Sequence, residues 1–153
     1  MIILSPYSSK LRNGANNPKN YPHWQNVVDM IISMGLPIVQ VGVLGETPLK
    51  GTTLAFNLSL GELTDLVQNP KCKTWASVDN FFPHLCSHTT KPGVVVWSKS
   101  DPEIFGYKQN TNILKDRSYL RPDQFGFWHD CAYDLEAFVS PTVVVNEVLS
   151  KCN

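Results

Sequence analysis

A β-rich run and an apolar run, separated by a helix-like segment, constrain the fold of this chain more than any other feature. Residues 93–97 form an uninterrupted apolar run, GVVVW, and residues 74–78 form a second β-rich run, TWASV. A strand without alternating polar residues is typical of a parallel sheet, because both of its faces are buried. We therefore read residues 74–97 as strand, sharp turn, helix and second strand.

The segment between the two runs predicts a helix that opens toward one edge of the sheet. We expect Asp79 to cap a helix that begins at Asn80, with Pro83 in its first turn, where a missing N–H is tolerated. Residues 91–93, Lys-Pro-Gly, end it. Such a helix points unpaired N–H groups at the carboxyl edge of the sheet and favours an anion there. His84 lies near this mouth and is either an additional donor or a satisfied structural histidine.

The same alternation of strands and helices runs through the rest of the chain. A helix over residues 21–34 has apolar side chains at one-face spacing, and a capping box at residues 59–62 starts another that ends at Asn69. Further strands are expected at residues 2–4, 37–43, 52–56 and 111–114, and a final helix from Ser140. This order predicts an α/β fold, a single Rossmann-like domain over residues 1–153 with a mostly parallel sheet and helices on both faces.

Composition excludes several classes of function. Thirteen basic and thirteen acidic residues cancel, which argues against nucleic acid or an anionic membrane as the main partner. No apolar run approaches the roughly 20 residues of a membrane span, and the N-terminus does not resemble a signal peptide. The four cysteines are scattered without a CxxC pair, so we expect reduced thiols and a cytoplasmic protein.

Common catalytic and cofactor motifs are missing from the sequence. It contains no GxGxxG, GxxxxGK[ST] or GxSxG, and therefore no standard dinucleotide, P-loop or serine-hydrolase signature. His129 and Cys131 lack a companion pair, so no metal site is expected. Cys86 and His88 are a weak nucleophile pair, and a buried thiol explains this cysteine better.

Two loops at the expected carboxyl edge carry candidate ligand-binding residues. Residues 5–20 contain Lys10, Arg12 and Lys19 without an acidic residue, which is typical of either a solvated loop or a phosphate-binding loop. Glu46 follows the second strand, where doubly wound folds place an acid that binds a ribose hydroxyl. A plain surface turn is the alternative for Glu46.

Two later segments complete this edge. Residues 98–106 are expected to form another loop after a strand, and residues 115–133 show no periodicity. A structureless loop of that length in a compact domain is usually functional. Its basic and aromatic side chains would either clamp a ligand or partner or pack on one another; they are Arg117, Tyr119, Arg121, Phe127 and Trp128.

The central run, SVDNFFPHLCSHTTKPGVVVWSKSDP, resembles the C-terminal donor-binding domain of the heptosyltransferase-like glycosyltransferases, which have the GT-B fold. Asp79 matches the family's aspartate, residues 84–85 its His-Leu pair, and residues 101–102 the Asp-Pro that ends its loop. Cys131 and residues 139–144 are similar to the family's ending. The resemblance covers most of the chain in order.

The resemblance implies a nucleotide-sugar donor such as an ADP- or UDP-sugar, bound without metal or cofactor. The diphosphate would rest on the backbone amides of residues 80 and 81, a basic residue of the first loop would neutralise it, and Glu46 would bind the ribose. The residues implied in donor and phosphate binding are Lys10, Arg12, Glu46, Asp79, Asn80, Phe81, His84, Ser98 and Asp101. No catalytic residue is implied.

Two departures from the family shape the functional hypotheses. Asn80-Phe81 stands where the family has Thr-Gly, and no counterpart of the N-terminal acceptor domain is present. We therefore expect a glycosyltransferase-like protein that binds a donor and transfers the sugar together with a partner chain or a dimer mate. The alternatives are a non-catalytic module that binds or sequesters a nucleotide or nucleotide-sugar, and an interaction protein with a vestigial pocket.

Overall fold

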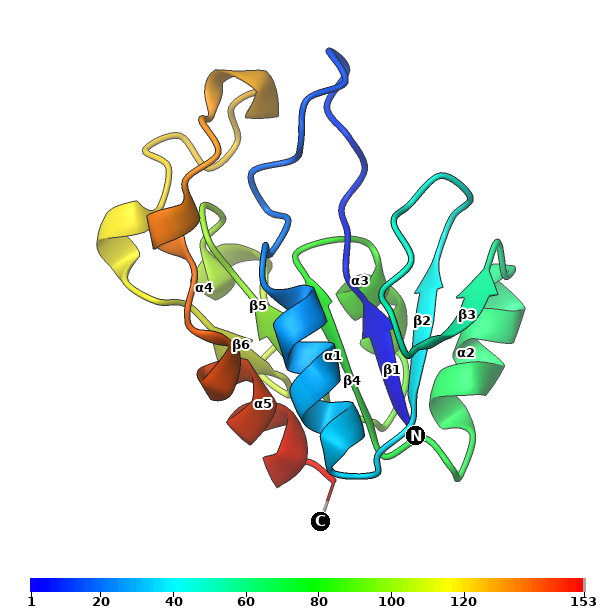
Figure 1. Cartoon of the computed structure of the whole chain (residues 1–153). Coiled ribbons are helices and arrows are strands. Elements are labelled where there is room, and N and C mark those ends of the chain that lie inside the picture. Colours follow the sequence, from blue (N-terminus) through cyan, green and yellow to red (C-terminus); the bar gives the residue numbers. More distant parts are fainter. Residues whose placement is uncertain (153) are drawn as a thin grey trace.

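The computed structural model describes residues 1–152 and contains a six-stranded sheet with helices on both faces (Figure 1). Every strand pairing is parallel, and the strand order is β3-β2-β1-β4-β5-β6. This order is typical of Rossmann folds. The strands are β1 (Ile2–Ser5), β2 (Ile38–Gly42), β3 (Thr53–Phe56), β4 (Thr74–Val78), β5 (Val94–Val96) and β6 (Thr111–Ile113). The predicted fold class is confirmed.

Each face of the sheet packs against its own pair of helices. Helices α1 (Trp24–Ser33) and α5 (Pro141–Ser150) cover one face, and α2 (Leu60–Gln68) and α3 (Phe82–Cys86) cover the other. Along β1, alternate side chains enter the two cores, because neighbouring residues of a strand point to opposite faces. Within residues 1–152, no helix has the length and apolar character needed to cross a membrane.

Two helix starts show how local sequence sets the element boundaries. The predicted capping box of α2 is confirmed: the Ser59 hydroxyl accepts from the Glu62 N–H, and the Glu62 carboxylate accepts from the Ser59 N–H. Helix α1 begins at Trp24, three residues later than predicted. Tyr21 is buried before the helix starts, and its hydroxyl donates to the Val139 carbonyl at 3.0 Å.

Helix α3 is shorter than the sequence predicted, and Asp79 does not cap it. The Asn80 side chain accepts from the Phe82 N–H at 2.9 Å, so the first helical residue follows an asparagine turn. The helix ends at Cys86, and the two hydroxyl residues that follow donate back to its carbonyls. The Ser87 hydroxyl donates to the His84 carbonyl at 2.7 Å, and the Thr89 hydroxyl donates to the Cys86 carbonyl at 2.8 Å. Such bonds compete with helical continuation.

The crossover from β2 to β3 contains no helix. Parallel strands are usually joined through a helix, whereas residues 43–52 make this connection as a loop. Gln40 in β2 is fully buried and holds the loop, accepting from the Leu49 N–H at 2.8 Å and donating to the Thr47 carbonyl at 3.1 Å. This fixed loop carries Glu46.

The two loops after β5 and β6 contain short helices that the sequence did not predict. Asp101 accepts from the Glu103 N–H and caps α4 (Pro102–Phe105) within the expected 98–106 loop. Residues 115–133, which we call the lobe, include the 3-10 turns Arg117–Tyr119 and Trp128–Asp130. A further 3-10 turn, Leu135–Ala137, leads to α5.

Candidate functional site

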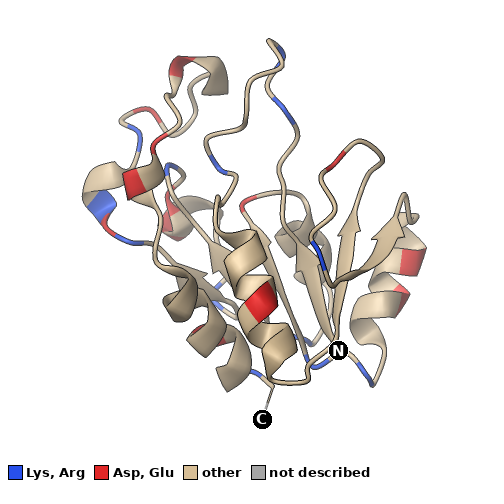
Figure 2. Ribbon diagram, viewed as in Figure 1, with Lys and Arg blue, Asp and Glu red and all other residues tan. Residues whose placement is uncertain are grey.

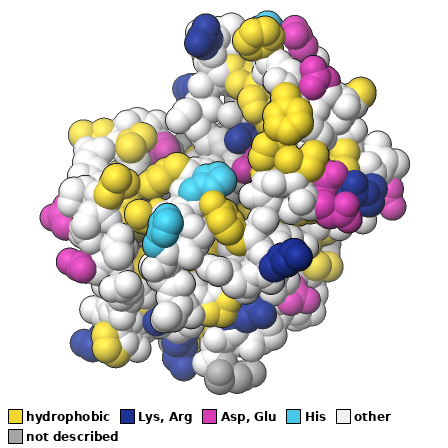
Figure 3. Space-filling model, turned by 180° about the vertical axis from the view of Figure 1, so that it is seen from behind, with side chains coloured by type: hydrophobic (Ala, Val, Ile, Leu, Met, Phe, Trp, Pro, Cys, Tyr) yellow, Lys and Arg dark blue, Asp and Glu magenta, His cyan; other side chains and the backbone are white. Residues whose placement is uncertain are grey.

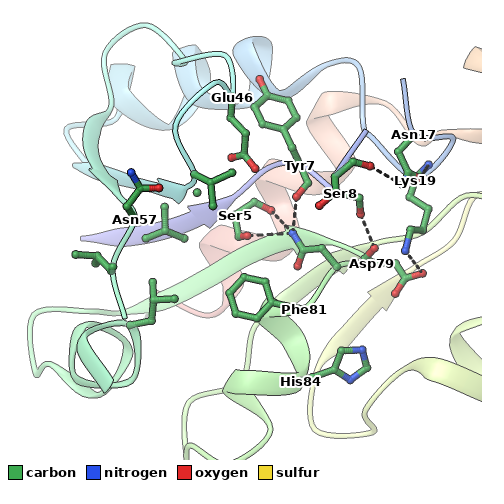
Figure 4. Close-up of a pocket in the computed structure, with 17 residues that line it drawn as sticks. Ser5, Tyr7, Ser8, Asn17, Lys19, Glu46, Asn57, Asp79, Phe81 and His84 are labelled. Carbon is green, nitrogen blue, oxygen red and sulfur yellow. Dashed lines mark hydrogen bonds and ion pairs between the residues drawn. The ribbon is translucent and has the colours of Figure 1, made fainter. Parts of the chain in front are cut away.

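A cavity of about 410 Å³ opens at the carboxyl ends of β1, β2 and β4 (Figure 4). The strand order reverses between β1 and β4, and such switch points are where open α/β sheets bind ligands. We call it the switch-point cavity. Its lining comprises Ser5, Tyr7, Ser8, Ser9, Asn17, Lys19, Val41, Gly42, Val43, Glu46, Asn57, Leu58, Leu63, Asp79, Asn80, Phe81 and His84.

The structure brings together five of the nine site residues predicted from the sequence. The five that line the switch-point cavity are Glu46, Asp79, Asn80, Phe81 and His84. Lys10 is exposed and lines a neighbouring hollow of about 420 Å³ that also contains Glu46. Arg12, Ser98 and Asp101 lie outside the switch-point cavity.

Ser98 and Asp101 make structural contacts at their own positions. The buried Ser98 hydroxyl donates to the Pro18 carbonyl at 3.0 Å and ties two loops together. Both Asp101 oxygens accept from the Arg117 guanidinium, at 2.7 and 3.2 Å. These hydrogen bonds hold the pKa of the Asp101 carboxyl below its usual value.

Asn80 joins the two central strands at the floor of the cavity. Its side-chain amide donates to the Ser5 carbonyl and hydroxyl and to the Tyr7 carbonyl, at 3.2, 3.0 and 3.0 Å. With the Phe82 N–H on its oxygen, the side chain makes four bonds. Asn80 therefore fixes the loop after β1 against the loop after β4.

Lys19 and Asp79 form the charged mouth of the cavity. The Lys19 ammonium lies 3.4 Å from Asp79 Oδ2, and 17% and 14% of the two side chains are exposed. The Ser100 hydroxyl donates to the same oxygen at 2.6 Å, and the Ser8 hydroxyl donates to the Asp79 carbonyl at 2.8 Å. Asp79 thus holds a cation at the point where the loops after three strands meet.

The sequence places Lys19 in the first loop, where only Lys10 and Arg12 were predicted to bind phosphate. Two aromatic residues could have directed attention to Lys19. Tyr21 and Trp24 follow it closely, and both are buried, so they fix the backbone near this lysine. Arg12 lies at the exposed tip of the loop, where nothing comparable fixes its position.

Glu46 turns back over the end of β2 and points into the cavity beside Tyr7 (Figure 4). An added Cβ at Gly42 would overlap its carboxylate, so a larger residue there would displace the Glu46 side chain. Burial raises the pKa of Glu46 above its usual value. The pKa of Tyr7 is also raised, first by burial and then by the Glu46 charge.

His84 lies at the opposite rim of the cavity and is exposed. Its Nδ1 is 2.8 Å from the Tyr107 hydroxyl, and the two rings meet edge to face. The Tyr107 carbonyl in turn accepts from the Asn112 side chain at 3.0 Å. Because Tyr107 occupies one ring nitrogen, Nε2 is the atom left for a ligand.

The lobe packs on itself and on Lys19. The Arg121 guanidinium donates to the carbonyls of Gln124 and Gly126 at 2.7 and 2.8 Å, and it stacks 3.6 Å from the Trp128 ring centre. The Lys19 ammonium lies 5.1 Å from the centre of the same ring. Inside the lobe, these side chains therefore pack on one another, which was one of the two alternatives that the sequence left open.

The residues described offer little for metal or thiol chemistry. No group of three or more potential ligands among residues 1–152 is arranged to hold a metal ion. The four cysteines are all unpaired, and burial raises the pKa of the Cys86 thiol, which makes it a poor nucleophile.

Comparison with solved structures places this fold among glycosyltransferases. A glycosyl transferase family 9 structure from Veillonella parvula matches with a TM-score of 0.74 and 17% identity over 99% of this chain. The E. coli ADP-heptose LPS heptosyltransferase II matches with a TM-score of 0.68 and 16% identity, also over 99%. The chain has the fold of one half of a heptosyltransferase. At these identities the match establishes the fold.

The matches cover nearly all of this chain but less than half of each matched protein. The chain spans 46% of the length of both of these proteins, and 43% of the E. coli heptosyltransferase WaaC, solved with ADP. That third match covers 98% of this chain at 14% identity, with a TM-score of 0.67. No protein-family model matches the sequence, and no curated protein matches it. The resemblance carried by residues 77–102 is confirmed at the level of the fold.

Proposed function

We propose that the switch-point cavity binds a nucleotide diphosphate sugar, an ADP- or UDP-sugar, and that sugar transfer requires a second protein chain or a dimer mate. One observation carries this proposal. A cavity of ligand size lies at the β1/β4 switch point, with Lys19 held at its mouth and the Glu46 carboxylate inside it. Its volume of about 410 Å³ lies within the range of small-molecule sites.

The lining divides the cavity into parts that suit the parts of such a ligand. Val41, Leu58 and Leu63 form an apolar end, which fits a nucleobase. The Glu46 carboxylate can accept hydrogen bonds from ribose hydroxyls. Lys19, at the other end, can neutralise the diphosphate.

Lys19 replaces the helix mouth as the main attraction for an anion. Helix α3 has only five residues, so few aligned peptide dipoles face the cavity. A diphosphate carries more negative charge than one carboxylate and would compete with Asp79 for the Lys19 ammonium. Asp79 would keep its hydrogen bond from Ser100 when this exchange takes place.

The second candidate is a non-catalytic module that binds or sequesters the nucleotide-sugar, and the cavity with Lys19 and Glu46 would serve this role equally well. The two candidates differ in the fate of the ligand. A module returns the nucleotide-sugar intact, whereas a transferase releases the nucleotide diphosphate when an acceptor and a partner chain are supplied.

Isothermal titration with ADP, UDP and their hexose and heptose conjugates tests the proposal. Lys19→Ala should weaken binding about tenfold to a hundredfold, because a charged hydrogen bond contributes about 1.5–3 kcal/mol. Lys71→Ala is the control, since it removes an exposed lysine that lines neither the switch-point cavity nor the hollow beside it, and it should change affinity less than twofold. Equal losses in both variants, or no binding by the wild type, would contradict the proposal.

A further inference from the structure

A second hollow, of about 300 Å³, meets the switch-point cavity at its charged mouth. The two spaces share Lys19 and Asp79, and the other residues that line the second one come from α4, the lobe and Ser100. We call it the aromatic hollow, because Phe105, Phe125 and Trp128 line it.

The aromatic walls are held in place although they face solvent. Phe125 is 79% exposed, yet its ring contacts Phe105 edge to face with centroids 5.6 Å apart. The neighbouring Gln124 side chain accepts from the Asp101 N–H at 2.8 Å and donates to the Lys99 carbonyl at 3.0 Å. Hydrophobic side chains are exposed on the surface of this region (Figure 3). A large exposed aromatic on a tethered backbone is a preformed contact surface.

We propose that the aromatic hollow binds a sugar ring. A pyranose presents C–H groups on its faces and hydroxyls around its rim, so it needs an apolar aromatic surface beside polar groups. The hollow combines Phe105 and Phe125 with Asp79, Gln124 and the Lys19 ammonium. The electron-rich face of an aromatic ring attracts the weakly positive C–H groups, and the side chains at the edge can bond to hydroxyls.

The position of the hollow agrees with the order of groups in a nucleotide-sugar, and this step rests on the proposed function. The apolar end of the switch-point cavity takes the base, Glu46 the ribose and Lys19 the diphosphate. The sugar follows the diphosphate in such a molecule, and the aromatic hollow begins at the same lysine. A sugar ring in the hollow therefore belongs either to the donor or to an acceptor that meets it there.

Phe125→Ala and Phe127→Ala form a matched pair of variants for the test. Both remove a phenylalanine of the lobe that is at least 75% exposed, but Phe127 does not line the aromatic hollow. Titration calorimetry would compare ADP and UDP with ADP-glucose and UDP-glucose for each variant. Saturation-transfer NMR would record contacts of methyl α-glucopyranoside and methyl α-mannopyranoside.

If the sugar ring in the hollow belongs to the donor, only ligands that carry a sugar should lose affinity. Phe125→Ala should weaken the nucleotide-sugars about twofold to tenfold and leave the nucleotide diphosphates unchanged, as expected for one aromatic contact. If the sugar ring belongs to an acceptor, Phe125→Ala should leave the nucleotide-sugar affinity unchanged and abolish the methyl glycoside signals. In either case Phe127→Ala should match the wild type.

The outcomes separate this inference from the proposed function. Methyl glycoside signals that depend on Phe125, in a protein that binds no nucleotide, would support the hollow and remove the nucleotide site. Nucleotide binding that depends on Lys19, with sugar affinities and signals identical in Phe125→Ala and the wild type, would overturn the hollow and leave the nucleotide site intact.

Discussion

Lysine and arginine residues lie near both ends of the sheet (Figure 2), and their contacts differ between the two ends. At the amino end, the Met1 amine, Lys73 and Lys91 all donate to backbone carbonyls that connect neighbouring segments. At the carboxyl end, Lys19 at the mouth of the cavity pairs with the Asp79 carboxylate instead, whereas Arg121 within the lobe donates to carbonyls. A cation that satisfies a carbonyl is part of the architecture, whereas a cation held by a carboxylate can be passed to another anion.

The two ends of the sheet also differ in how tightly their side chains are packed. At the amino end an added Cβ on Gly93 would overlap the Trp75 indole, whose N–H donates to the Lys91 carbonyl at 2.9 Å. At the carboxyl end the chain leaves a cavity of about 410 Å³ and the neighbouring aromatic hollow. The comparison predicts that a substitution at the amino end changes stability alone, whereas one at the carboxyl end also changes ligand affinity, and three substitutions test this difference.

The largest effect is expected where the carboxyl end depends on a single side chain. Asn80→Ala removes four hydrogen bonds, three of which join the loop after β4 to the end of β1 and the loop that follows it, and should lower the free energy of unfolding by about 2–4 kcal/mol. Nucleotide affinity should fall as well, because these bonds fix the floor of the cavity. Urea unfolding and titration calorimetry measure the two effects, with Asn26→Ala, an exposed asparagine of α1, as the control. Full stability in Asn80→Ala would show that the network is dispensable.

Gly93→Ala tests the amino end. The new Cβ meets the buried Trp75 indole, so we expect a loss of about 1–3 kcal/mol in the free energy of unfolding. Below the unfolding temperature, the affinity of the variant for nucleotides should equal that of the wild type. An affinity change comparable to that of Asn80→Ala would disprove the division between the two ends.

Glu46→Gln is expected to have the smallest effect on stability. Because burial raises the folded-state pKa of Glu46, ionisation disfavours the folded state as pH rises through the folded pKa. The variant should therefore be slightly more stable than the wild type at pH 7, and the difference should vanish at pH values below the usual glutamate pKa. Thermal unfolding from pH 3 to pH 8 measures this, and a difference independent of pH would refute the interpretation. Nucleotide affinity should fall through the loss of the ribose contact.

Much of the fold could be predicted, because it is encoded in local patterns. The apolar runs of β1 and β5, the β-rich run of β4 and the capping box of α2 are readable without tertiary information. The length of α3 was not, since the asparagine turn before it and the hydroxyls after it compete with a helical pattern that is otherwise acceptable.

The candidate site was predictable where a residue lies a few positions after the end of a strand, in the turn or short helix that follows it. Asp79, Asn80 and Glu46 meet that condition and line the cavity. Lys19 reaches the cavity from the end of a long loop. Its contact with Trp128 joins two residues that are 109 positions apart in the sequence. Distances of this kind are set by tertiary packing, which no local pattern contains.

The central position of β1 has a consequence for synthesis on the ribosome. β1 pairs with β2 through residue 38 and later, but its other edge is covered only when residues 74–77 arrive. A three-stranded sheet formed before that point would have an open, apolar edge at β1. Such edges invite pairing with other chains, and long-range parallel pairing is slow. Emergence of β4 covers this edge and creates the floor of the switch-point cavity, and the buried strand β4 stays open in turn until β5 pairs with it.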